Sequence, residues 1–500
     1  MFKNFPGYKV LEKIQKNKSH KRERKLPLNA IKLIFIVAIT SIIALLPTDS
    51  FGIEGLTVIH QRIIALFVFA ALMWLTEAMP SWVTSMIVVT IMLFTVSTSS
   101  FNFLRPNGPD NLDGLIPFKS IMACFANPTI MLFIGGFVLA IGLTKVKLDV
   151  ALARVLLKPF GTRSEVVLLG FILVTAIFSA FVSNTATAAM MLAFLTPVLR
   201  SLPADGKGRI ALALAIPVGA NLGGMITPIG TPPNMIALDY LSSIGQGISF
   251  VDWTIKMAPF VIVLLVLSWF LLRVMFPFKQ KNIKIEIEGN IRWDFKTWSV
   301  VAAFAITIFM WMFGTDLWGI DTNVVAMIPI AIFCATGILT RRDLEEINWS
   351  VLWMVAGGFA LGVALNYSDA NSVSLSSLIV SSVPFDSFAP LVVMVLAGLI
   401  CFGFSNFISH SAATSLLVPV LGVIAVGLGD SLAEFGGSQA MLVGIAIASS
   451  VSMILPISTP PNAIAHSTGF IQQKDMMKVG IIVGLLGLVL GYSMLIFIGF

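Results

Sequence analysis

Residues 166–199 read VVLLGFILVTAIFSAFVSNTATAAMMLAFLTPVL, which is two apolar runs joined by the polar tripeptide Ser183-Asn184-Thr185. Each run is shorter than the roughly 20 apolar residues that an upright membrane helix needs. The polar groups of the tripeptide would lack partners in lipid, and irregular backbone at that depth is tolerated only where protein or water surrounds it. The stretch therefore predicts a re-entrant helical hairpin, residues 164–200, whose polar tip lies near the middle of the bilayer.

The pattern occurs twice in the chain. Three motifs recur in the same order at nearly one offset: FIGGF (133–137) as VAGGF (355–359), FVSNTATAAMMLAFLTPVL (181–199) as FISHSAATSLLVPVL (407–421), and TPIGTPPN (227–234) as LPISTPPN (455–462). This repetition predicts two related halves, each with a hairpin tip followed by a helix that is broken at proline. Interrupted apolar segments at matching positions of two halves are the best sequence indication of a transporter's binding site.

The composition is that of an integral membrane protein. Of the 500 residues, 57% are hydrophobic and only 11% are charged, which excludes an ordinary soluble domain. The net charge of +7 does not indicate nucleic-acid binding, because ten of the basic residues lie in the first 32 positions. A basic flank beside a first apolar run typically anchors a chain to anionic lipid. The three cysteines lie in apolar runs without disulfide or metal spacing: Cys124, Cys334 and Cys401.

We expect an all-α membrane protein with about eleven transmembrane helices and two re-entrant hairpins in an inverted-topology repeat. The expected order is a basic cytoplasmic segment without a cleavable signal peptide (1–29), a first transmembrane helix (30–50), a first repeat (51–276) with hairpin 164–200 and broken helix 209–244, a cytoplasmic connector (277–296), and a second repeat (297–500) with hairpin 387–421 and broken helix 438–470.

The distribution of positive charge predicts the orientation. With the N-terminus in the cytoplasm, the predicted cytoplasmic segments hold 28 of the 32 lysines and arginines, as the positive-inside rule requires. An odd number of crossings then places the C-terminus outside, and the two hairpins enter from opposite faces. The expected location is the cell membrane.

The predicted site is suited to a small anion with more than one negative charge. At each hairpin tip a new helix begins, with unsatisfied N–H groups and the positive end of its dipole. Ser183, Asn184 and Thr185 are typical capping residues and add donors at the same place. In TPIGTPPN, Thr231 suits a cap and Pro232 the first helical position. Two such arrangements facing each other predict a pocket for a molecule with a carboxylate at each end.

The paired tips, the G-T-P-P-N and S-T-P-P-N loops and the GGF segments resemble the divalent anion/sodium symporter family over about residues 120–470. The resemblance implies a homodimer that carries di- or tricarboxylates, sometimes sulfate, by an elevator movement of the hairpin-containing part against a fixed scaffold. It implies substrate contacts from two sides: Ser183, Asn184, Thr185, Thr231 and Pro232 from the first half, and Ser409, Ser411, Thr459 and Pro460 from the second. It also implies a sodium site, whose hard oxygen ligands suit a small cation, made by Ser179, Ser183, Asn184 and Gly230.

The second tip departs from the family's pattern. Where the family has Ser-Asn-Thr, with the asparagine helping to hold a second sodium ion, this chain has Ser409-His410-Ser411. Imidazole has no carbonyl oxygen and, when protonated, repels a cation. We therefore hypothesise that His410, as imidazolium, replaces the second sodium ion beside the substrate, because a neighbouring dianion favours its charged form.

A fixed cation differs from a sodium ion because it cannot leave with the substrate. An empty site would carry its charge through a medium of low dielectric at a considerable cost, so loaded carriers would cross and empty ones would stall. This reasoning favours obligate exchange of dicarboxylates. The first sodium site keeps sodium symport open, and deprotonation of His410 keeps proton coupling open. The donors also do not distinguish C4 to C6 carboxylates from an inorganic oxyanion such as sulfate.

Other functional classes fit the sequence less well. A membrane enzyme would need a nucleophile–base pair or a metal cluster, and the four histidines have no such spacing. The sequence has no G-x-x-x-x-G-K-[ST] motif, so an ATP-driven pump is not expected. The expected partners are the carboxylate anion, the lipid bilayer and a second copy of the chain, without nucleic acid. No cofactor other than a sodium ion is expected.

Overall fold

The computed structural model describes residues 26–106, 108–203, 206–283, 292–370, 372–384 and 387–499. Within these ranges the chain is helical, and the only β-structure consists of isolated bridges. Nine of the described helices have the length and apolar composition needed to cross a membrane, and shorter apolar helices accompany them. The predicted all-helical membrane fold is therefore confirmed, while the number of crossings stays a prediction.

The helices of the first half, in chain order, are α2 (Leu26–Leu45), α3 (Val58–Thr76), α4 (Ser81–Thr95), α5 (Phe118–Ala123), α6 (Pro128–Lys145), α7 (Leu148–Leu157), α8 (Ser164–Phe181), α9 (Asn184–Ser201), α10 (Gly208–Gly223), α11 (Pro232–Ser243) and α12 (Phe250–Met275). Those of the second half are α13 (Phe295–Trp318), α14 (Thr322–Val325), α15 (Met327–Ala335), α16 (Arg341–Glu345), α17 (Trp349–Asn366), α18 (Leu375–Ser382), α19 (Pro390–Phe407), α20 (His410–Leu428), α21 (Gly437–Ser450), α22 (Pro460–Ser467) and α23 (Gln473–Phe497).

Each predicted hairpin consists of two helices separated by two extended residues. Val182 and Ser183 separate α8 from α9, with ψ angles of 150° and 137°. Ile408 and Ser409 separate α19 from α20, with ψ angles of 170° and 145°. A serine ends each break because its non-helical backbone and its hydroxyl acceptor together form a helix N-cap.

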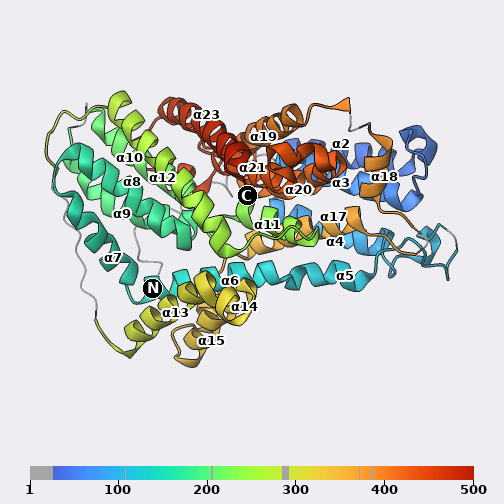
Figure 1. Cartoon of the computed structure of the whole chain (residues 1–500), viewed down its shortest axis with the longest axis horizontal. Helices are drawn as coiled ribbons and strands as arrows, with labels where there is room; N and C mark the ends of the chain where they lie inside the picture. Colours follow the sequence, from blue (N-terminus) through green and yellow to red (C-terminus); the bar gives the residue numbers. More distant parts are fainter. Residues whose placement is uncertain are drawn as a thin grey trace.

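Corresponding helices of the two halves pack in the same way. α10 packs against α8, α9 and α12, and its counterpart α21 packs against α19, α20 and α23. Across the halves, α9 contacts α22, and α20 contacts α11. In Figure 1 the α8–α9 hairpin lies toward the left end of the molecule and α20 toward the right. Two related halves would produce this matched packing, and the inverted orientation of the halves stays a prediction.

Several predicted boundaries differ from the structure. The first transmembrane helix, expected over 30–50, begins at Leu26 and ends at Leu45. Residues 1–25 of the predicted basic segment and residues 284–291 of the predicted connector lie outside the described residues. The short helices α7 and α18 were not predicted, because neither is a long apolar run. They occupy matching places, each directly before the first helix of a hairpin.

An ion pair ties the end of α6 to the short helix α16. The ammonium of Lys145 contacts the carboxylate of Asp343 and also donates to the carbonyl of Ile338. Burial pushes the pKa of Asp343 upward, but hydrogen bonds from Lys145 and Thr340, with the Lys145 charge, outweigh burial and hold that pKa below its ordinary value. The pair joins a helix of the first half to a helix of the second half.

Candidate functional site

The first tip has the N-terminal geometry that the sequence predicts. The Ser183 hydroxyl caps α9 by accepting a hydrogen bond from the Ala186 N–H at 3.3 Å. Asn184 and Thr185 occupy the first two positions of α9 and are half-buried. Their backbone N–H groups point out of the helix start, where no carbonyl of the same helix can accept from them. The tip therefore offers donors to an anion.

Oxygen atoms gather beside this tip. The buried Ser179 hydroxyl lies 2.6 Å from Asn184 Oδ1 and 2.7 Å from the carbonyl oxygen of Ala220. A hydroxyl carries one proton, so only one of these two oxygens can receive it at a time. A cluster of neutral oxygens with surplus lone pairs suits a hard cation, by analogy with calcium and magnesium. Two of the four predicted ligands, Ser179 and Asn184, thus lie together and suit a sodium ion, and the site as a whole stays a prediction.

The loop between α10 and α11 contributes through a residue that the sequence reasoning missed. A Cβ atom on Gly224 would lie 2.5 Å from Asn184 Oδ1, so this glycine packs directly against the tip. The predicted ligand Gly230 lies behind it, because a Cβ on Gly230 would lie 2.4 Å from the Gly224 carbonyl oxygen. The sequence feature that could have indicated this contact is the glycine pair Gly223-Gly224, which precedes TPIGTPPN. Gly224 is therefore a loop residue in direct contact with Asn184, and the role of Gly230 as a sodium ligand stays a prediction.

The second tip repeats the cap but differs at its next residue. The Ser409 hydroxyl accepts a hydrogen bond from the Ala412 N–H at 3.3 Å. His410 is buried, and its Nε2 lies 2.6 Å from the carbonyl oxygen of Ser452. Because a carbonyl oxygen only accepts, Nε2 carries a proton and donates it. Ser452 is the residue that corresponds to Gly224 at the repeat offset of the Pro-Pro-Asn loops.

A hydroxyl relay holds the backbone of this tip. The Ser405 hydroxyl donates to the Ser449 hydroxyl at 3.2 Å, and the Ser449 hydroxyl donates to the His410 carbonyl oxygen at 3.0 Å. Thr414 donates to the same carbonyl at 2.8 Å. The relay leaves the His410 ring directed at the loop after α21, where Ser452 lies.

Both Pro-Pro-Asn loops are fastened by their asparagine. Asn234 Nδ2 donates to the carbonyl oxygens of Gly224 and Thr227, at 3.0 and 2.8 Å. Asn462 Nδ2 likewise donates to two carbonyl oxygens at the end of the preceding segment, those of Met453 and Leu455, at 2.9 and 3.1 Å. The loops are therefore rigid supports for the helices that follow them.

The N-cap residues of α11 and α22 are both buried threonines, and each is followed by a proline. Thr231 is 4% exposed and Thr459 is 3% exposed. The Thr459 hydroxyl accepts from the Asn462 N–H at 3.2 Å, whereas the Thr231 side chain makes no capping bond. Pro232 and Pro460 occupy the first positions of α11 and α22, where a missing N–H costs nothing.

The structure joins the predicted residues into two assemblies that meet. Asn184 meets its own loop at Gly224, and His410 meets its own loop at Ser452. The two halves are joined by Asn221, near the end of α10, which donates to Thr459 and Asn462 of the second half. Thr185 and Ser411 lie at the second positions of α9 and α20, beside the caps.

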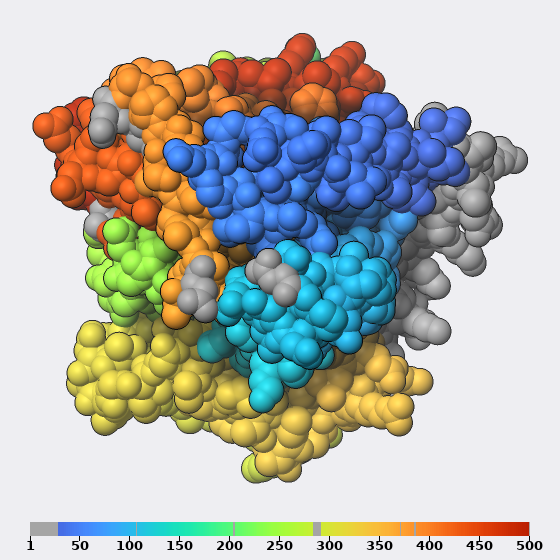
Figure 2. Space-filling model, turned by 90° about the vertical axis from the view of Figure 1, so that its right-hand side faces the viewer, coloured from blue at the N-terminus to red at the C-terminus, as the bar shows by residue number. Residues whose placement is uncertain are grey.

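A cavity of about 1600 Å³ leads toward these assemblies. Its walls come from α6, α11, α17, α18 and α20, and the segments at its mouth surround a hollow in the face that Figure 2 shows. The cavity stops short of the tips. It reaches Ser415, four residues beyond Ser411 on α20, and Met235, three residues beyond Pro232 on α11, so about one helical turn separates it from these two predicted contacts.

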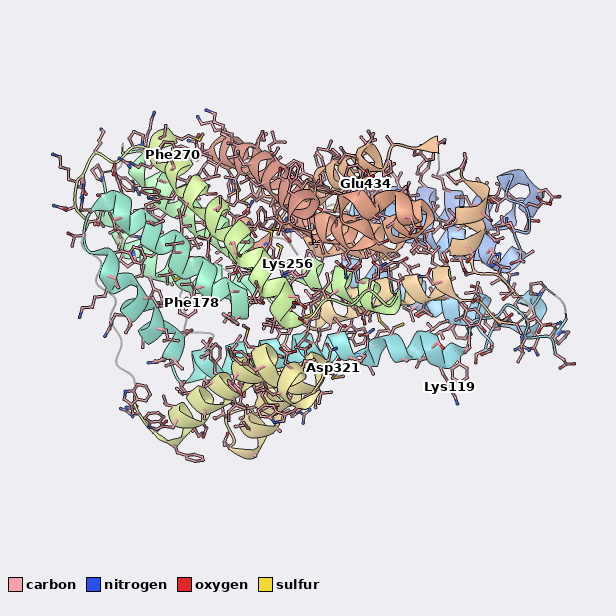
Figure 3. All side chains as sticks on the ribbon, viewed as in Figure 1. Lys119, Phe178, Lys256, Phe270, Asp321 and Glu434 are labelled. Carbon is pink, nitrogen blue, oxygen red and sulfur yellow. The ribbon has the colours of Figure 1, made fainter. Side chains whose placement is uncertain are left out.

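Hydroxyl and amide groups dominate the polar lining of the cavity. Among the described residues that line it, the charged side chains are those of Asp239 and Asp321. Figure 3 places Asp321 at the start of α14, below α11 in that view. Asp239 Oδ1 accepts a hydrogen bond from the Thr129 hydroxyl at 2.9 Å. This contact links α11 to the first turn of α6.

Comparison with known proteins places the chain among membrane transporters. The sequence model of the sodium:sulfate symporter transmembrane region matches residues 28–499. The chain is 31% identical over 439 residues to an uncharacterized transporter of Haemophilus influenzae, covering 84% of this chain and 88% of that protein. It is 28% identical over 465 residues to the sodium-dependent dicarboxylate transporter SdcS of Staphylococcus saprophyticus, covering 85% and 84%.

Two further similarities are more distant. The inorganic phosphate transporter PHO87 of Saccharomyces cerevisiae is 25% identical over 440 residues, which is 88% of this chain and 45% of that protein. The crystal structure of the Alcanivorax borkumensis YdaH transporter has a TM-score of 0.52 at 10% identity, covering 84% of this chain and 99% of that one. The second similarity concerns the fold alone.

Proposed function

The chain belongs to the sodium:sulfate symporter family, and from this premise we propose that it exchanges C4 to C6 di- or tricarboxylates across the cell membrane. As a member of this family it is a secondary transporter and not an enzyme. The proposed substrate class is supported by the relatives that are named dicarboxylate transporters. It is also supported by the two capped helix starts, which together suit a molecule with a carboxylate at each end.

The observation that carries the proposal is the hydrogen bond from His410 to the Ser452 carbonyl. In the first half the matching pair is Asn184 and Gly224, where oxygens gather around Ser179. In the second half an N–H occupies the place where a cation would need a free carbonyl oxygen. Imidazole also offers no oxygen of its own. In our proposal His410, as imidazolium, stands in for a second sodium ion there.

Exchange follows from a cation that cannot leave. With a dianion bound, the positive ring balances one of its two charges, and the loaded site crosses at low electrostatic cost. Without substrate, the same charge would have to cross alone, which is expensive in a medium of low dielectric. The empty carrier stalls until a second dicarboxylate binds.

The movement is an elevator in which α8–α12 and α19–α23 travel together against the remaining helices. The matched packing of α10 and α21 with their own hairpins supports one compact moving unit. The chain forms a homodimer, with its N-terminus in the cytoplasm and its C-terminus outside. The orientation is supported by the positive-inside distribution of lysine and arginine.

Sodium-coupled symport is the main alternative. The oxygen cluster of Ser179, Asn184 and the Ala220 carbonyl favours it, because a first sodium ion has suitable ligands there. The names of the staphylococcal relatives point the same way. An inorganic anion as substrate is favoured by the family description and by the phosphate transporter among the relatives.

Replacing His410 by asparagine tests the proposal. In proteoliposomes loaded with dicarboxylate, we expect His410→Asn to weaken exchange and to make uptake depend on sodium, because the amide oxygen restores a cation ligand. The matched control is His466→Asn, the same change at a half-buried histidine of α22. If His410→Asn exchanges dicarboxylate at the wild-type rate and its uptake does not depend on sodium, His410 has no role in the mechanism.

A further inference from the structure

Asn221 links the first half to the second Pro-Pro-Asn loop by hydrogen bonds. It lies near the end of α10 and is 1% exposed. Its Nδ2 donates to the Thr459 hydroxyl at 3.2 Å and to Asn462 Oδ1 at 3.1 Å. Both partners lie more than 230 positions away in the chain, so this single amide spans the boundary between the two halves.

The surrounding bonds fix which end of the Asn221 amide faces the loop. Asn462 Nδ2 donates to the carbonyl oxygens of Met453 and Leu455. Because carbonyl oxygens only accept, the nitrogen of Asn462 has to face them and its oxygen has to face Asn221. Asn221 therefore presents its nitrogen, and both of its hydrogens have acceptors.

The two partners of Asn221 determine where the N-terminus of α22 lies. Thr459 caps α22, and Asn462 holds the loop before it. The same end of α10 also touches the first tip, because the Ala220 carbonyl contacts Ser179 and Gly224 packs against Asn184. One short segment, residues 220–224, thus contacts both the first hairpin tip and the loop that precedes α22. The spacing between the two ends of the site depends on it.

The corresponding residue of the second half makes no such link. Ser449 occupies the position that matches Asn221, and its hydroxyl is engaged within its own half, by Ser405 and the His410 carbonyl. A serine side chain is also shorter than an asparagine. The cross-link between the halves is therefore built from one side, by Asn221.

We propose that Asn221 is a positioning residue that sets the distance between the first tip and the N-terminus of α22, and with it the length of dicarboxylate that the site prefers. The inference rests on the proposed function, because it concerns the same site. It assigns the length preference to a residue that does not itself contact the substrate.

The test compares dicarboxylates of increasing length in proteoliposomes. Exchange of succinate, glutarate and adipate is measured for wild type, for Asn221→Ser and for Asn221→Gln, and kcat/KM is compared between lengths. Serine is too short to reach the loop, so we expect the preference among lengths to weaken by about tenfold, the effect of one or two lost buried hydrogen bonds. Glutamine keeps the amide one methylene farther out, so we expect the preferred length to change.

The controls separate positioning from general damage. Asn102→Ser makes the same change at an exposed position and should leave all rates unchanged. If the serine variant fails to elute as a folded protein, the glutamine variant decides alone. An equal loss for all three lengths, or an unchanged preference in the glutamine variant, overturns the inference. If wild type exchanges none of the three and does not exchange citrate either, the proposed function itself is wrong.

Discussion

Gly224 has to lack a side chain because Asn184 occupies the space. A Cβ atom there would lie 2.5 Å from Asn184 Oδ1 and 2.9 Å from its Nδ2. Asn184 in turn lies at 2.6 Å from Ser179, inside the oxygen cluster. The position of the Asn184 side chain at the first tip therefore depends on glycine at position 224.

Gly224→Ala is expected to displace the Asn184 side chain and to raise the KM of exchange by at least about tenfold, through the loss of a buried hydrogen bond. The matched control is Gly136→Ala in α6, where a Cβ atom would meet nothing within 4 Å. That change should leave transport intact and stabilise the helix by about 1 kcal/mol. Substrate titrations of both variants provide the check, and a wild-type KM for Gly224→Ala would disprove the contact.

The sequence predicted those site residues whose type and position in a motif indicate their role. Ser183 and Ser409 were predictable because serine before an apolar run is a helix-start signal. Asn221 and Ser452 were not, because their roles come from which helix ends meet in space. Asn221 lies inside a helix, and Ser452 contributes only its carbonyl, a group that every residue has.

At the scale of helices, α11 is one of the elements that join the hairpin-containing helices to the others. Asp239 accepts from Thr129 at the start of α6. The next residue, Tyr240, forms a hydrogen bond with the side chain of Asn366 at the end of α17. In the proposed elevator, α11 moves while α6 and α17 stay, so these contacts break in each cycle.

Tyr240→Phe removes one of these contacts and leaves the ring packed. We expect the maximum exchange rate to rise between about twofold and tenfold, since one net hydrogen bond no longer has to be broken. Tyr492→Phe is the control, because the buried Tyr492 hydroxyl has no hydrogen-bond partner in the described structure. A maximum rate for Tyr240→Phe at or below that of wild type would contradict this role of α11.

The long apolar helices were predictable from hydropathy, and the short helices α7 and α18 were not. α12 and α23 are each 25 residues or longer and apolar over most of their length, so they appear as runs in the sequence. α7 carries charged residues and α18 is rich in serine, and each spans at most ten residues. Their helical form depends on packing against neighbouring helices, which the sequence pattern does not record.

At the scale of the molecule, the two halves share one site because their helices interlock. The helix after the first tip packs against the helix after the second loop, and the helix after the second tip packs against the helix after the first loop. The repeat in the sequence predicted two such halves. It did not predict the one-sided link at Asn221 or the cavity lined by α6, α11 and α17, since both arise from the fit between elements.

The central claim is that a fixed cation at the second tip makes wild-type transport an exchange. Uptake of labelled succinate is measured in proteoliposomes, with and without dicarboxylate inside, and with and without an inward sodium gradient. We expect rapid uptake only into vesicles that contain dicarboxylate, because the empty carrier does not return. Strong sodium-driven uptake into empty vesicles would contradict the account and identify the protein as a symporter.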